Sequence, residues 1–71
     1  MKLTMLFKEN GSGGSGCPSV YIDENGDFVV QGLELDADTT GNLLNVLPGE
    51  HAVRISAEIV LGAVEAYRSK R

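Results

Sequence analysis

Four oxygen-bearing side chains have the spacing of a calcium-binding loop. Asp23, Asn25, Asp27 and Glu34 would occupy positions 1, 3, 5 and 12 of such a loop, where oxygen ligands surround the ion. Position 6 is Phe28, whereas the sharp turn of that loop requires glycine. The flanking segments have the pattern of strands rather than helices. We therefore expect a solvated hairpin turn and no specific metal site, with a small-ligand or cation-binding domain that uses the acidic turns as the alternative.

Six residues of a Gly/Ser-rich segment match a dinucleotide-binding fingerprint. Residues 11–16 read Gly-Ser-Gly-Gly-Ser-Gly and fit the pattern G-x-G-x-x-G. That pattern binds a pyrophosphate only where a strand precedes the glycines and a helix N-terminus follows them. Here Cys17 and Pro18 lead into a predicted strand. The composition instead predicts a flexible segment, and we expect no cofactor.

The residues that could act as nucleophiles or metal ligands lack partners in the sequence. Cys17 is the only cysteine, which excludes an internal disulfide and a cysteine-based metal cluster. His51 is the only histidine, and we expect it at the surface. It is also the only conceivable base for the hydroxyls of Ser12, Ser15 and Ser19, and the spacing supports no nucleophile–base pair. The sequence predicts no catalytic residue and a protein that is not an enzyme.

Length and charge limit the classes of partner. The chain has 71 residues, and a domain of this size buries only about 60% of its unfolded surface, so that a partner or a second copy would help to stabilise it. The net charge of -4 argues against direct nucleic-acid binding, which needs clustered Lys and Arg. The longest apolar runs fall far short of the roughly 20 residues that span a bilayer. With a single cysteine, the reducing cytoplasm is the expected location.

The pattern of apolar residues predicts a small α+β domain over 17–71. Asn25 and Gly26, between two apolar runs, predict an antiparallel hairpin over residues 19–32, because they supply the positive backbone dihedrals of a tight turn. Alternation predicts a further strand over 51–55 in the same small sheet. Residues 1–16 are expected to form an N-terminal strand or tail, with an edge strand over 2–8, followed by the Gly/Ser-rich segment.

One amphipathic helix is predicted over residues 57–69, with Ser56 as its N-cap and one face packed on the sheet. Leu61 would project away from its apolar stripe, which consists of Ile59, Val60, Ala63, Val64 and Tyr67. A short helix is predicted over 39–46, with a strand through Leu43–Leu47 as the competing assignment.

Apolar side chains on the helix and the hairpin are the candidate protein interface. One short sheet does not hide all of them, although an amphipathic stripe is normally the buried face. Leu61 is the residue for which we most expect outward exposure. The candidates are Leu61, Val64 and Tyr67 on the helix, with Phe28 and Val30 on the hairpin.

The order of these elements resembles a family of small actinomycete developmental proteins, those of the BldB and WhiJ-associated type. The resemblance covers roughly Cys17 to Tyr67 and is carried by Cys17, the hairpin that ends in Phe28-Val29-Val30-Gln31-Gly32, the segment Leu47–Ile55 and the terminal helix. It implies a cytoplasmic accessory protein that self-associates or binds a helix-turn-helix regulator and alters its action on DNA. The resemblance implies no catalytic residue. A self-contained homodimer with a structural role is a further alternative for the function of this chain.

Overall fold

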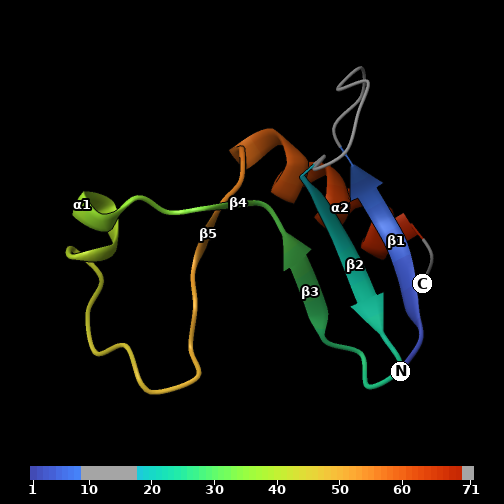
Figure 1. Cartoon of the computed structure of the whole chain (residues 1–71). Helices are drawn as coiled ribbons and strands as arrows, with labels where there is room; N and C mark the ends of the chain where they lie inside the picture. Colours follow the sequence, from blue (N-terminus) through green and yellow to red (C-terminus); the bar gives the residue numbers. More distant parts are fainter. Residues whose placement is uncertain (9–17, 70–71) are drawn as a thin grey trace.

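The computed structural model describes residues 1–8 and 18–69 and has the predicted α+β fold (Figure 1). Its sheet strands β1, β2 and β3 lie side by side in that order, and a long helix covers one face. The Gly/Ser-rich segment, for which the sequence predicts flexibility, and Cys17 lie outside the described residues. The elements are β1 (Leu3–Lys8), β2 (Ser19–Asp23), β3 (Phe28–Gln31), β4 (Leu33–Glu34), α1 (Ala37–Thr40), β5 (Val53–Arg54) and α2 (Ala57–Ser69).

The predicted hairpin is formed by β2 and β3, which pair antiparallel. Its turn differs from the expected one because only Gly26, with φ of 88°, adopts a positive dihedral within it. The side chain of Asp23 explains the difference: its Oδ1 accepts hydrogen bonds from the backbone N–H groups of Asn25 at 2.9 Å and Asp27 at 3.0 Å. This local carboxylate bonding stabilises a longer loop than a two-residue turn.

Strand β1 forms the other edge of the sheet, as the edge strand expected over 2–8. Its register against β2 shifts between Met5 and Phe7, so that Leu6 lies at a β-bulge. Leu6 is buried in the core, and the neighbouring Phe7 also packs against it. The irregularity therefore lets two consecutive side chains of one strand serve the same hydrophobic core.

Helix α2 covers the sheet and has the predicted bounds, Ala57–Ser69. The predicted N-cap is confirmed, because the Oγ of Ser56 accepts a hydrogen bond from the N–H of Ile59 at 3.3 Å. Gly62 faces the ring of Phe7, and a Cβ at this position would lie 2.6 Å from the nearest ring carbon. The buried core consists of Leu6, Val20, Ile59 and Ala63.

Residues 33–55 leave the sheet and form an extended loop, here called the arm, which reaches away from the sheet and α2 (Figure 1). At its base β4 pairs with β5 through two residue pairs, Leu33 with Arg54 and Glu34 with Val53. The strand expected over 51–55 is thus shorter, and it pairs outside the main sheet. Gly32 permits this arrangement, since a Cβ there would lie 2.5 Å from the carbonyl oxygen of Arg54.

The short helix of the arm begins earlier and ends earlier than the predicted range of 39–46. Asp36 is its N-cap, and the helix ends at Thr40, before Gly41. Glycine is unfavourable in a helix by about 1 kcal/mol relative to alanine. Residues 43–47 form neither the helix nor the competing strand, and Asn45 has a positive φ of 54°. The apolar residues after the helix therefore lie on irregular backbone.

Candidate protein-interaction surface

The arm exposes apolar side chains that the sheet and α2 do not cover. The side chain of Leu44 is 87% exposed, that of Leu33 is 64% exposed and that of Leu47 is 61% exposed. No residue of the arm is buried. Isolated exposed leucines are ordinary, whereas exposed apolar residues that line one pocket together indicate an interaction site. The full set of large apolar residues exposed on the arm is Leu33, Leu43, Leu44, Val46, Leu47 and Val53.

The arm has two legs, residues 33–46 and residues 51–55, which with the turn between them line a partly open cavity of about 740 Å³. Apolar residues from both legs line it: Leu35, Leu43, Leu44 and Val46 from the first, and Ala52 and Val53 from the second. Polar groups complete the lining, namely Thr40, Glu34, Glu50 and His51, together with Gly32. The cavity thus combines an apolar lining with two carboxylates.

A turn at the far end of the arm connects the two legs. The backbone N–H of Glu50 donates a hydrogen bond to the carbonyl oxygen of Leu47 at 3.0 Å. The Oε1 of Glu50 in turn accepts a hydrogen bond from the N–H of Leu47, also at 3.0 Å. Gly49 adopts a φ of 89°, a conformation that favours glycine. These bonds fix the position of Glu50 beside the cavity.

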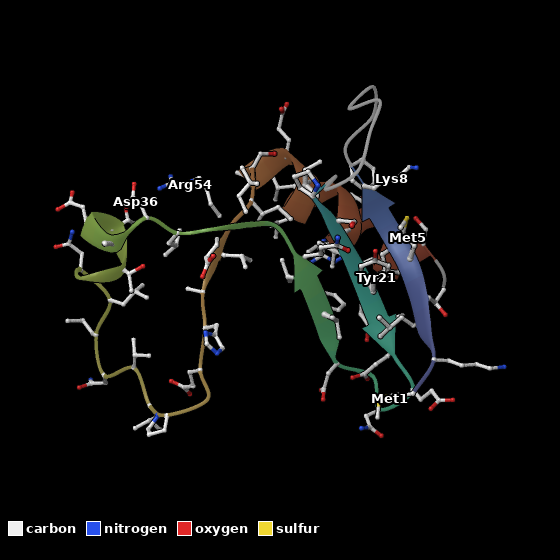
Figure 2. All side chains as sticks on the ribbon, in the orientation of Figure 1. Met1, Met5, Lys8, Tyr21, Asp36 and Arg54 are labelled. Atoms are coloured by element: carbon white, nitrogen blue, oxygen red, sulfur yellow. The ribbon has the colours of Figure 1, made fainter. Side chains whose placement is uncertain are left out.

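A side-chain hydrogen bond between α1 and β5 also connects the two legs of the arm. Asp36 Oδ1 accepts a hydrogen bond from the N–H of Thr39 at 2.7 Å, and Arg54 Nη2 donates one to Thr39 Oγ1 at 3.4 Å. Asp36 and Arg54 lie near each other beside α1 (Figure 2). Hydrogen bonds from Thr39, and to a smaller degree the charge of Arg54, lower the pKa of Asp36 below its ordinary value. The ionised carboxylate is therefore the form that caps α1.

The interface residues predicted from the sequence lie apart from the cavity. Phe28 on β3 and Tyr67 on α2 contact each other edge to face, with ring centroids 5.3 Å apart and planes at 84°. Val30 is exposed on β3, whereas Val64 on α2 is half-buried. Leu61 is 65% exposed, which confirms its expected projection from α2. None of these five residues lines the cavity.

Part of the opposite face of the sheet is also apolar. Val20 belongs to the core beside α2, so that the alternation of β2 directs Tyr21 to the other face. Met5 is directly opposite Tyr21 in the β1–β2 register, and both are labelled in Figure 2. The Oη of Tyr21 donates a hydrogen bond to Gln31 Oε1 at 2.8 Å. This face therefore carries a polar contact beside its apolar residues.

The acidic turns bind backbone groups of their own chain. Asp23 accepts two backbone hydrogen bonds in the hairpin turn, and Asp36 accepts one at the start of α1. Within residues 1–8 and 18–69, no three His, Cys, Asp or Glu side chains are placed to hold a metal ion. His51 is exposed, as expected, and belongs to the cavity lining.

The sequence predicts a helix or a strand for the apolar residues 43–47 of the arm, so it does not indicate that they form an exposed surface. The available signal was the run Leu43-Leu44-Asn45-Val46-Leu47 before Pro48 and Gly49. This run has neither a clear helical period nor strict alternation. An apolar segment that fits neither pattern is compatible with exposure on a loop.

Comparison with protein-family models, with curated proteins and with solved structures finds no match for this chain. In the part of the chain that the structure describes, no helix is long and apolar enough to cross a membrane. The exposed apolar arm and its cavity form the candidate interaction surface of the described residues.

Proposed function

We propose that this chain is a non-enzymatic protein-interaction module whose binding surface is the arm. The observation that carries the proposal is the exposure of apolar side chains around the arm cavity, above all Leu44. The core uses four other residues, all in β1, β2 and α2. Apart from Ile55, which packs against the core, the apolar side chains of the arm lie outside it, and we assign them a role in binding.

The energy available from covering the arm is comparable to the stability of a small domain. Complete burial of a Val or Leu side chain is worth about 1.5–3 kcal/mol. Scaled by their exposed fractions, the six large apolar residues of the arm would contribute roughly 5–10 kcal/mol in a complex. Losses of translational, rotational and side-chain freedom offset part of this gain. Because those losses amount to about 4–15 kcal/mol, burial of the arm's apolar residues contributes to a complex but does not determine its affinity.

We infer that the partner is a helix-turn-helix transcriptional regulator in the cytoplasm, on which this chain acts as an accessory or antagonist. The resemblance of residues 17–67 to the actinomycete developmental proteins supports this identity. The net charge of -4 suits a partner with a basic, DNA-binding surface, because complementary charge favours the encounter of two proteins. Self-association through the same exposed surfaces belongs to the same class of function.

The test is affinity capture from lysate of the native host with three forms of the tagged chain. These are the unmodified protein, Leu44→Asp on the arm and Leu61→Asp on α2, which places the same charge on an exposed leucine outside the cavity. We expect the unmodified protein and Leu61→Asp to recover a helix-turn-helix regulator, and Leu44→Asp to lose it. Equal recovery by all three forms would exclude the arm as the binding surface.

A small-ligand or cation-binding domain is the second candidate, favoured by the cavity of about 740 Å³. That volume falls within the range of about 300–1,000 Å³ found for small-molecule sites. A ligand that binds only the native state must raise the midpoint of thermal unfolding. Melts with and without millimolar calcium test the cation version, and an unchanged midpoint would count against it.

A further inference from the structure

We propose that the arm cavity binds the apolar face of an amphipathic α-helix that carries Lys or Arg beside that face. The inference rests on the proposed interaction function and specifies the chemistry of the segment that the arm recognises. Its basis is the combination of an apolar lining from both legs of the arm with carboxylates as the charged groups of that lining.

The volume and lining of the cavity suit several large apolar side chains. A buried cavity of about 150 Å³ is large enough to bind benzene. The arm cavity, at about 740 Å³, has room for several partner side chains of that size. Leu43, Leu44 and Val46 line it from the first leg. A helix in a groove presents such side chains at positions i, i+3 or i+4, and i+7 along one face.

The backbone of the arm favours a helix over an added strand. A strand binds to a sheet edge through a continuous row of backbone hydrogen bonds. Here β4 and β5 contain two residues each and pair with one another. In the first leg Asn45 has a positive φ of 54°, which breaks the extended course of the backbone beside the cavity. The cavity therefore offers side chains rather than a straight backbone edge.

The charges of the arm select a basic helix. Glu34 and Glu50 line the cavity, and the lining includes neither Lys nor Arg. Arg54, the arm's basic side chain, donates to Thr39 on the opposite leg. Like-charge contacts across an interface cost affinity, so that an acidic helix with the same apolar face is disfavoured.

Two synthetic peptides of about 14 residues, close to four helical turns, provide the test. Both peptides have leucine along one face of the helix. All remaining positions are lysine in one peptide and glutamate in the other. Binding to the full chain is measured by fluorescence anisotropy at low and high salt. We expect the lysine peptide to bind at least about tenfold more tightly than the glutamate peptide, with the difference reduced at high salt.

Variants locate the site and its charge. Leu44→Asp should weaken binding of the lysine peptide at least about tenfold, whereas Leu61→Asp, an equivalent change on α2, should leave it unchanged. The double variant Glu34→Gln and Glu50→Gln should weaken binding and reduce its salt dependence. Glutamine at position 50 keeps a side-chain oxygen that can accept the hydrogen bond from the N–H of Leu47.

Three outcomes would overturn the inference. The first is equal affinity for both peptides, and the second is peptide binding that Leu44→Asp leaves intact. The third is a dimer, seen by light scattering of the purified chain, that Leu44→Asp dissociates, because a second copy would then cover the arm. Loss of a captured regulator in Leu44→Asp, together with failure of the lysine peptide, would retain the arm as the interface and refute only the helix.

Discussion

Replacement of Gly62 by alanine tests the packing of α2 against Phe7 of β1. In an exposed helix this change stabilises a protein by about 1 kcal/mol through helix propensity. At position 62 the new Cβ would lie 2.6–2.8 Å from three ring carbons of Phe7. Carbon atoms in favourable contact are about 3.5–4.0 Å apart, so the ring must move by roughly 1 Å. Phe7 packs against the core, which restricts that movement.

We expect Gly62→Ala to lower the free energy of unfolding by about 1 kcal/mol. Extra methyl groups in a packed core cost about 1–3 kcal/mol, which exceeds the gain from helix propensity. The assay is urea denaturation followed by far-ultraviolet circular dichroism, at one fixed protein concentration because association shifts apparent stability.

A double-mutant cycle with Phe7→Leu isolates the contact. Leucine lacks the ring carbons that the new Cβ meets, so Gly62→Ala in this background should raise the free energy of unfolding by about 1 kcal/mol. The coupling between the two positions is then about 2 kcal/mol. Stabilisation by Gly62→Ala of equal size in both backgrounds would refute the placement of the Phe7 ring over Gly62.

Four further predictions concern the core, the arm and the turns. Ile59→Ala should lower the free energy of unfolding by about 2–5 kcal/mol in urea denaturation, because Ile59 is buried in the core. Leu44→Asp should change that energy by less than about 0.5 kcal/mol, and a larger loss would show that the arm supports the fold. Gly26→Ala should lower the midpoint of thermal unfolding, since alanine is strained at a φ of 88°. The pKa of Asp36 is lower in the folded state than its unfolded value of about 3.9. Its ionised form therefore stabilises the fold fully above the unfolded pKa, and this effect is lost as the pH falls through the folded pKa. Asp36→Asn should consequently flatten the acid side of a curve of stability against pH.

The elements that the sequence predicts correctly depend on interactions between residues close to one another in the sequence. Helix α2 follows from Ser56 as its N-cap and from the helical spacing of Ile59 and Ala63, and these signals lie within a few residues of one another. The hairpin likewise follows from its turn residues, although the bonds to Asp23 change the type of turn. Local signals of this kind determine an element without knowledge of its neighbours.

The arm could not be predicted in the same way, because its course depends on contacts between distant residues. Residue 33 pairs with residue 54, and Arg54 donates to Thr39 fifteen positions earlier. The close approach of Gly32 to the backbone of Arg54 directs the chain away from β3. No local pattern indicates such contacts, and the apolar run after α1 therefore predicts regular structure that the chain does not form. The cavity forms because these long-range contacts hold the two legs of the arm together.

The buried core and the proposed binding surface use different residues of this chain. The buried core side chains belong to β1, β2 and α2, whereas the arm contributes Ile55, which packs against that core, together with exposed side chains and a two-pair ladder. A segment with so few buried contacts is expected to open locally at low cost in free energy. Binding of a partner would then order the arm without rearranging the core. Substitutions on the arm should consequently separate loss of binding from loss of stability, and the pairing of Leu44→Asp with Leu61→Asp depends on that separation.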